Sequence, residues 1–204
     1  MREASFFRER ILWEDGLSSV AGIDEAGRGA WAGPLYAAAV VFPPKVKLPF
    51  PLFDSKALAP KRRVELAKVV RSHALAFSFG VAEVPLIERC GISYATEHAM
   101  LQALEGLGLS PDFVLIDFFK IRSFPRWQQE GIVKGDQLSA SIAAASILAK
   151  VERDSLMSKF DQVYPGYNFA LHKGYGTRVH QEALGRLGLS KVHRPSFIPK
   201  KILQ

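Results

Sequence analysis

Cysteine is nearly absent from this chain of 204 residues, and long apolar runs are absent altogether. Because Cys90 is the single cysteine, the chain forms neither an internal disulfide nor a zinc site built from several thiolates. No apolar segment approaches the ~20 residues that a membrane-spanning helix needs. Residues 1–5 also lack the apolar core of a signal peptide. We therefore expect a soluble cytoplasmic protein that does not bind membranes.

Acidic residues are fewer than basic ones, 20 against 27, which gives a formal net charge of +7. The composition is otherwise that of a globular protein, with 48% hydrophobic and 23% charged residues. A basic surplus on such a chain favours a polyanionic partner, with nucleic acid ahead of a membrane surface. The length is sufficient for one domain with a substantial core and a small C-terminal addition.

The apolar pattern predicts a mixed α/β chain. We expect strands over 18–24, 35–42, 74–84 and 112–117, and helices over 6–13, 61–72, 93–107, 138–160 and 179–187. Residues 86–90 are expected to form a single turn, and residues 121–130 to be irregular. Crossover helices imply that the later strands run parallel to the first strand.

Two adjacent carboxylates, Asp24 and Glu25, stand between an apolar strand and the glycine-rich segment Gly27-Arg28-Gly29. Neighbouring side chains on a regular strand point to opposite faces, so the two acids share a site only where the strand ends or bends. Glycines permit such a bend and let a ligand approach the backbone. Carboxylates suit a hard cation, whereas amides and an arginine suit an anion. The segment therefore predicts a place where a metal and a phosphate meet.

Asp117 and Asp136 also stand at the ends of predicted elements, beside buried apolar segments. In α/β sheets, sites form at the carboxyl ends of strands, which is where Asp24 and Asp117 fall. Clustered carboxylates repel one another unless divalent cations neutralise them, and two cations ~3.5–4 Å apart suit a phosphoryl displacement. The alternatives are a solvated turn for Asp24 and Glu25, a strand-end turn for Asp117, and a helix cap for Asp136.

The segment 172–177 combines a cation, an aromatic ring and flexible backbone. Tyr175 is placed to stack on a sugar or a base, and the alternative is that it packs within its own loop. Asp154, late on the long predicted helix, is expected to be solvated or ion-paired. Other histidines show no metal-ligand spacing and are expected to be structural: His73, His98 and His180.

In order along nearly the whole chain, blocks of this sequence resemble ribonuclease HII, the type 2 ribonuclease H family. The blocks are Asp24-Glu-Ala-Gly-Arg-Gly29 with Ala32-Gly-Pro34, Asp54-Ser-Lys56, Val114-Leu-Ile-Asp117, Lys134-Gly-Asp136, the segment 141–154, His172-Lys-Gly-Tyr-Gly-Thr177 and His193-Arg-Pro-Ser-Phe197. The resemblance implies an α/β ribonuclease H-like fold with a mixed five-stranded sheet flanked by helices. It also implies a catalytic domain over 1–163 and a C-terminal helical extension over 164–204 that completes the substrate site.

The resemblance further implies a metal-dependent endoribonuclease that acts in ribonucleotide removal from DNA. Such an enzyme hydrolyses the RNA strand of RNA–DNA hybrids and incises duplex DNA 5′ to a single ribonucleotide, leaving 3′-hydroxyl and 5′-phosphate ends. Its cofactor is Mn²⁺ or Mg²⁺. The implied catalytic acids, which are also the metal ligands, match Asp24, Glu25, Asp117 and Asp136. The implied substrate-binding positions match Gly27, Arg28, Gly29, Lys56 and Tyr175.

Two segments depart from the family pattern. Phe118-Phe119-Lys120 stands where a polar loop containing Gly-Asn is usual, and Ala30-Trp31 replaces the commoner Pro-Leu. Neither change removes an expected catalytic group, but both bear on substrate preference and rate.

Two other functions compete with this one. A non-catalytic nucleic-acid-binding module has no use for the acids, and a nuclease acting on DNA alone has no use for the Gly-Arg-Gly and Tyr175. We expect a monomer whose partners are RNA–DNA hybrids and ribonucleotide-containing duplex DNA. The basic tail over 190–204 either docks on a sliding clamp or is an untethered terminus, and the second is expected.

Overall fold

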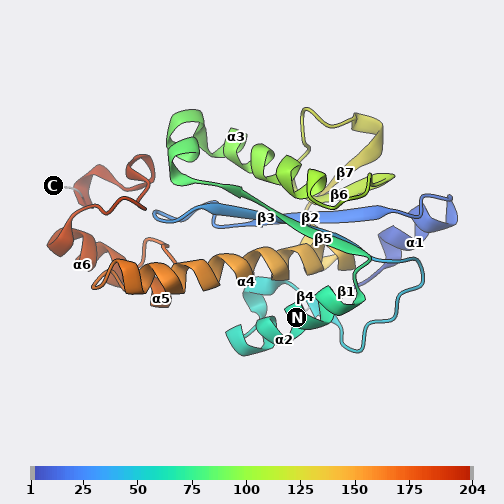
Figure 1. The fold of residues 1–204 in the computed structure, drawn as a ribbon, viewed down its shortest axis with the longest axis horizontal. Helices are drawn as coiled ribbons and strands as arrows, with labels where there is room; N and C mark the ends of the chain where they lie inside the picture. The colour runs from blue at the N-terminus through green and yellow to red at the C-terminus, as the bar shows by residue number, and fades with distance from the viewer. Residues whose placement is uncertain (1–2, 203–204) are drawn as a thin grey trace.

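A mixed five-stranded β-sheet forms the centre of the protein in the computed structural model, which describes residues 3–202 (Figure 1). The strands lie in the order β5-β3-β2-β6-β7. β3 is antiparallel to both of its neighbours, β2 and β5, whereas β6 and β7 run parallel to β2. The strands are β2 (Val20–Ala26), β3 (Leu35–Val41), β5 (Ala76–Ala82), β6 (Phe113–Asp117) and β7 (Gln129–Ile132).

Helices cover both faces of this sheet, with α3 on one face and α4 and α2 on the other (Figure 1). Alternation along the strands supplies both cores: Ala38 and Val40 pack toward α4, and Ala37 and Ala39 pack toward α3. A Cβ on Gly22 would lie 2.2 Å from the Ser141 carbonyl carbon, so β2 and α4 pack closely. The three helices are α2 (Pro60–His73), α3 (Val84–Glu105) and α4 (Ala140–Val163).

Shorter elements complete the chain at both ends. Near the N-terminus, β1 (Glu3–Ala4) pairs with β4 (Leu52–Phe53), and α1 (Phe7–Glu14) lies between β1 and β2 in the sequence. Near the C-terminus, α5 (Phe169–His172) and α6 (Arg178–Leu187) pack against the second half of α4 through a small core of their own. Within residues 3–202, no helix combines the length and apolar character needed to cross a membrane.

The predicted fold class is confirmed, including the parallel pairing of the first strand with the strand over 113–117. Two local predictions are wrong. The segment expected to be irregular contains β7, an edge strand whose polar residues hide it; Gln129 is buried because its side chain bonds the backbone of Ile121. The expected single turn is the start of α3, because Pro85 suits a first helical turn and the break comes later, at Gly91 with φ +80°.

The basic tail is packed where it is described, so the expectation of an untethered terminus is wrong for residues 190–202. Arg194 and Ile198 are buried, and short 3-10 turns follow at Pro195–Phe197 and Lys200–Ile202. Residues 203–204 lie outside the described part of the chain.

Candidate active site

Three of the four predicted acids meet at one end of the sheet. Asp24, Asp117 and Asp136 each offer a carboxylate oxygen, and these oxygens lie within 4.8 Å of one another. Parallel pairing of β2 with β6 sets Ile23 opposite Ile116, so the aspartates that follow both residues are neighbours. Asp136 arrives from the short 3-10 turn Gly135–Gln137. We call these three residues the carboxylate cluster.

The turn that carries Asp136 is fixed by hydrogen bonds to its neighbours. The Gly135 N–H donates to Asp117 Oδ1 at 2.7 Å, and a Cβ on Gly135 would lie 2.6 Å from Ile142. A Cβ at position 135 would therefore displace the end of the Ile142 side chain, and it would meet Asp117 Cα and Oδ1 at 3.4 Å. Ser139, not Asp136, caps α4, because its side chain accepts from the Ile142 N–H. The helix-cap interpretation of Asp136 is therefore wrong.

Glu25 is not part of the carboxylate cluster. The ladder between β2 and β3 continues through Ala26, so the strand does not bend at the acids. Ile23 packs on the α3 face and Ala26 on the α4 face, which starts the Glu25 side chain on the face opposite to Asp24. Its carboxylate instead lines an adjacent groove, beside Arg28.

Burial and mutual repulsion raise the pKa values of the four predicted acids at this end of the sheet. Burial raises the pKa of Asp24 well above its usual value, and the charges of Glu25 and Asp117 add to the effect. Burial raises the pKa of Glu25 to about 7, and burial with the Asp117 charge raises that of Asp136 to about 6. Burial is also the main cause of the raised pKa of Asp117. These groups therefore favour a positive charge or protons beside them.

Two carboxylate oxygens here are buried without a hydrogen-bond partner among residues 3–202, Asp24 Oδ2 and Glu25 Oε2. Buried polar atoms in native proteins are nearly always satisfied, so these oxygens mark places for a ligand atom. Carboxylate oxygens at this spacing are the donor set that Mg²⁺ and Mn²⁺ prefer. The residues present therefore fit a divalent cation.

Lys56 supplies a positive charge at the edge of the cluster. Its Nζ lies 3.9 Å from Asp136 Oδ2, and its backbone N–H donates to Asp54 Oδ1 at the start of a 3-10 turn. Burial opposes the charge of Lys56, but the carboxylates of Asp24 and Asp136 raise its pKa overall. Its side chain is 70% exposed, so it is free to contact a ligand as well.

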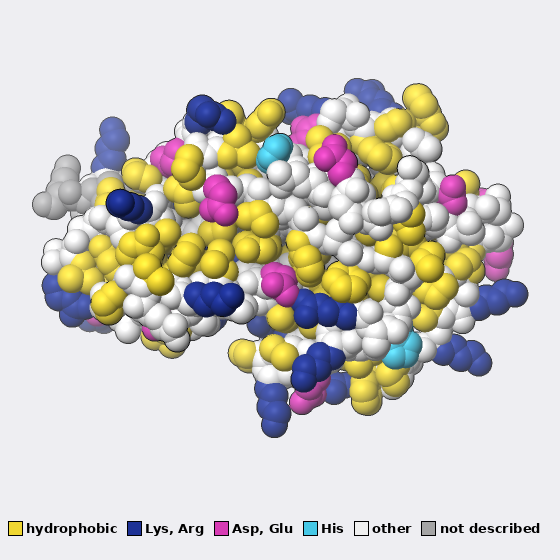
Figure 2. Space-filling model, in the orientation of Figure 1, with side chains coloured by type: hydrophobic (Ala, Val, Ile, Leu, Met, Phe, Trp, Pro, Cys, Tyr) yellow, Lys and Arg dark blue, Asp and Glu magenta, His cyan; other side chains and the backbone are white. Residues whose placement is uncertain are grey.

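A groove of about 470 Å³ runs from the acids toward the C-terminal segments. In Figure 2 the outline of the molecule is indented between α2 and α5, with Lys and Arg side chains along the α2 edge. Such a volume and this excess of cations suit a polyanionic ligand. The lining residues are Glu25, Ala26, Gly27, Arg28, Gly29, Ser55, Lys56, Arg63, Lys150 and Tyr175. All the predicted substrate-binding positions lie in this groove.

The buried side chain of Arg153 packs against the Gly-Arg-Gly loop. Gly27 has φ +93°, and a Cβ there would lie 1.9 Å from Arg153 Nε, so position 27 requires glycine on two grounds. Gly29 is different, because a Cβ there would meet nothing within 4 Å. The Arg28 guanidinium lies 4.1 Å from the Phe119 ring centroid, and its Nη1 is buried without a partner among the described residues.

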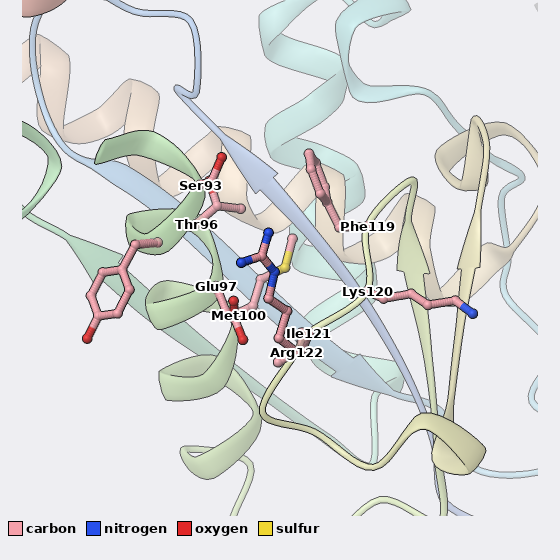
Figure 3. A pocket seen from close by; sticks show the side chains of 9 residues that line it. Ser93, Thr96, Glu97, Met100, Phe119, Lys120, Ile121 and Arg122 are labelled. Atoms are coloured by element: carbon pink, nitrogen blue, oxygen red, sulfur yellow. The ribbon is translucent and has the colours of Figure 1, made fainter. Parts of the chain in front are cut away.

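The Phe118-Phe119 departure reaches the groove through Arg28, which lines it. Phe119 packs under Arg28, whereas Phe118 is 64% exposed and adopts φ +62°, a strained conformation for an aromatic residue. Phe119 also borders a second pocket beside α3, where Arg122 extends its guanidinium toward Thr96 while Lys120 points away (Figure 3). That pocket contains none of the predicted site residues.

Comparison with known proteins identifies the family of this chain. The sequence model of the ribonuclease HII family matches residues 21–200. The chain is 48% identical over 195 residues to the ribonuclease HII of Dehalococcoides mccartyi, which covers 95% of this chain and 92% of that protein. This chain belongs to the ribonuclease HII family. It is therefore a ribonuclease H, and enzymes of this family depend on divalent metal ions.

Solved structures of ribonucleases H share the fold at lower identity. The RNase HII of Archaeoglobus fulgidus, solved as a complex with PCNA, has a TM-score of 0.73 at 23% identity and covers 91% of this chain and 97% of its own. Bst-RNase HIII, solved in complex with Mn²⁺, has a TM-score of 0.69 at 20% identity and covers 92% and 69%. The ribonuclease HII fold is thus present from the central sheet through the C-terminal helices.

Sequence reasoning missed two fully buried arginines that organise this ribonuclease HII site. Arg153 donates to the carbonyls of Ala32, Pro34 and Lys173, and Arg194 donates to those of Gly27, Arg28 and Gly33. In the sequence, these two arginines stand out only as members of the motif blocks at 141–154 and 193–197. The neighbouring residues do not indicate that either side chain is buried. Asp154, by contrast, is ion-paired as predicted, with Arg63 and Lys150.

Proposed function

We propose that this protein is a metal-dependent endonuclease that hydrolyses the RNA strand of RNA–DNA hybrids and incises duplex DNA 5′ to a single ribonucleotide. The observation that carries the proposal is the carboxylate cluster, with three aspartate oxygens within 4.8 Å, opening beside a cationic groove. The products are 3′-hydroxyl and 5′-phosphate ends, and the cellular role is removal of ribonucleotides from DNA.

Asp24, Glu25, Asp117 and Asp136 are the proposed catalytic acids and metal ligands, with Glu25 beside the carboxylate cluster rather than within it. A bound Mn²⁺ or Mg²⁺ supplies Lewis-acid stabilisation of the phosphate and lowers the pKa of an attacking water. The unpartnered Asp24 Oδ2 and the raised pKa values of these acids support the assignment, because both are relieved by a cation. Lys56 balances the negative charge that remains.

The Gly-Arg-Gly loop and Tyr175 are the proposed readers of the ribonucleotide. The 2′-hydroxyl is the group that distinguishes RNA from DNA, and the backbone at residues 27–29 lines the groove in which it would be read. The buried, unpartnered Arg28 Nη1 lines the same groove and suits a phosphate oxygen. The Tyr175 ring, 37% exposed, is available to stack on a sugar.

The C-terminal extension over 164–204 is proposed to complete this substrate site on a catalytic domain over 1–163. Two observations support the division of labour. Tyr175 reaches the groove from the extension, and Arg194 in the extension bonds the Gly-Arg-Gly loop of the catalytic domain.

The experiment is cleavage of a labelled DNA duplex carrying one embedded ribonucleotide, beside an all-DNA duplex, with Mg²⁺, with Mn²⁺ and with chelator. The expected result is a metal-dependent nick 5′ to the ribonucleotide and no cut in the control duplex. Asp117→Asn should abolish the nick and keep duplex binding, whereas Glu182→Gln on the outer face of α6 should cut like the parent. Cutting of both duplexes would contradict the proposal, and so would parental cutting by Asp117→Asn.

A further inference from the structure

Three histidines from separate segments meet beneath the Tyr175 loop, away from the carboxylate cluster. His172 ends α5, His180 lies in α6, and His193 lies in the C-terminal segment; all three are buried. The rings of His172 and His180 stack with centroids 4.2 Å apart, and the Nε2 atoms of His180 and His193 are 3.0 Å apart. Each ring nitrogen therefore has a neighbour close enough to bond.

The position of the proton on His193 follows from its neighbour. The Ser190 backbone N–H can only donate, and it lies 2.8 Å from His193 Nδ1. His193 Nδ1 must therefore accept, so the neutral ring carries its proton on Nε2. That proton points at His180.

The position of the proton on His180 follows from the other side. The Tyr175 carbonyl can only accept, and it lies 3.0 Å from His180 Nδ1. His180 therefore carries its proton on Nδ1, which leaves Nε2 free to accept from His193. Both ring assignments therefore give the same hydrogen bond, in which His193 Nε2–H donates to His180 Nε2.

His172 is fixed in the same way beside this pair. Its Nδ1 accepts from the Gly174 N–H at 3.1 Å, and its Nε2 donates to the Tyr167 carbonyl at 2.7 Å. Burial lowers the pKa of His180 and of His193 to about 4, so both rings are neutral at neutral pH. The Gly174 N–H and the Tyr175 carbonyl are thus each held by an imidazole in a single tautomer.

We infer that His193 and His180 form a directional hydrogen-bond relay, from the Ser190 N–H to the Tyr175 carbonyl, that positions Tyr175 against the substrate. The inference rests on the proposed function of Tyr175 and deepens it, because it names the residues that set ribonucleotide recognition from behind. The residue after His193 is Arg194, which bonds the carbonyls of Gly27 and Arg28. One short segment therefore aligns both proposed readers of the ribonucleotide.

A direct test needs no activity measurement. Long-range ¹H–¹⁵N NMR of the histidine rings should show His180 as the Nδ1–H tautomer, and His172 and His193 as Nε2–H tautomers, at neutral pH. An Nε2–H tautomer at His180, or a charged ring at His180 or His193, would overturn the relay. Because the spectrum is recorded on the free protein, this result stands whether or not the proposed nuclease function does.

A matched pair of variants tests the positioning role. The side-chain amide of Asn occupies roughly the place of Nδ1, so His180→Asn keeps the bond to the Tyr175 carbonyl; His180→Gln reaches toward Nε2 and loses that bond. Loss of one such hydrogen bond corresponds to a change of roughly tenfold in an equilibrium constant. His180→Gln should raise KM for the single-ribonucleotide duplex about tenfold with kcat nearly unchanged, and His180→Asn should recover most of that loss.

A control and a contradicting result complete the test. His98→Gln, at the stacked His98–Tyr94 pair of α3, should leave both constants unchanged. Equal losses in His180→Asn and His180→Gln, or a loss confined to kcat, would overturn the positioning role. Circular dichroism of each variant identifies any that fail to fold, and for these the tautomer measurement on the parent decides.

Discussion

The two sides of the groove satisfy their buried polar groups in opposite ways. In the carboxylate cluster and the adjoining Glu25, buried oxygens lack partners among the described residues, and burial raises the pKa of each acid. In the Tyr175 loop, the buried ring nitrogens of His172, His180 and His193 all have partners, and burial lowers their pKa values. The first side leaves oxygens for a ligand to contact, and the second is complete by itself.

This difference separates the chemistry from its alignment. Clustered carboxylates without partners repel one another, so the binding of a cation lowers the free energy of the site. Such a site is therefore expected to bind a divalent metal tightly. A loop that is fully bonded before substrate arrives pays little to hold its aromatic ring in place, as preorganised sites require.

Asp24→Asn should have the largest effect. Removal of one proposed ligand carboxylate should lower kcat by at least about 100-fold, as loss of a central electrostatic group does in other enzymes. The same variant should be more stable than the parent without metal, because a buried repelling charge is gone. Single-turnover cleavage and thermal melting in chelator measure the two effects. A metal-free variant less stable than the parent would contradict the contrast.

Arg194→Lys should cost the most stability on the other side. One ammonium cannot replace a guanidinium that bonds the carbonyls of Gly27 and Gly33 together, and lost bonds to buried groups cost about 2–4 kcal/mol in total. Urea unfolding measures the loss. Arg178→Lys on the exposed face of α6 is the control and should unfold like the parent. Equal unfolding of the two variants would show that the buried bonds are unimportant.

Gly27→Ala should destabilise the protein by about 1–3 kcal/mol, because position 27 combines a positive φ with the Arg153 contact. Gly29→Ala is a matched control two residues away, where a Cβ meets no neighbour, and it should stay within about 0.5 kcal/mol of the parent. Unfolding midpoints decide between them. Indistinguishable midpoints would refute the close approach.

The pH dependence of stability should show the sign expected for a raised pKa. The pKa of Glu25 is about 7 in the folded protein, above that of an unfolded glutamate. The folded state therefore holds this proton longer, and its stabilising contribution is lost as pH rises toward and through 7. Without metal, Glu25→Gln should match the parent near pH 5 and be more stable at pH 8. A difference that is constant with pH would contradict this.

Phe119→Leu should have the smallest effect. A cation over an aromatic ring contributes about 0.5–1 kcal/mol at a partly exposed site, which predicts a KM increase of about two- to fivefold with kcat unchanged. Phe118→Leu at the exposed neighbour separates stacking under Arg28 from direct substrate contact. Unchanged KM in Phe119→Leu would show that the ring does not position Arg28.

The sequence was most informative where residues lie at the ends of strands. Asp24 and Asp117 follow apolar strands, so parallel pairing predicts their meeting, and the structure places them together. It was least informative where a polar side chain serves a distant backbone segment. The Arg194 bonds to Gly27 span 167 residues, and no local pattern indicates them.

Two other misses have local physical causes. β7 was missed because an edge strand needs little apolar alternation, and the Gln129 side chain is bonded by the loop before it. The second miss concerns the histidines. His180 was expected to be structural, but its bond to His193 was not predicted, because that bond is set by the packing of α5, α6 and the tail.

Calorimetric titration of the metal-free protein with Mn²⁺ measures whether a divalent cation binds at the carboxylate cluster. At pH 6.5, in two buffers of different ionisation enthalpy, binding should release protons, because the pKa values of Glu25 and Asp136 are raised to about 7 and about 6. Asp117→Asn should weaken binding at least about tenfold. Tight Mn²⁺ binding without proton release, unaffected by Asp117→Asn, would show that the metal binds elsewhere and that the carboxylate cluster is not completed by a cation.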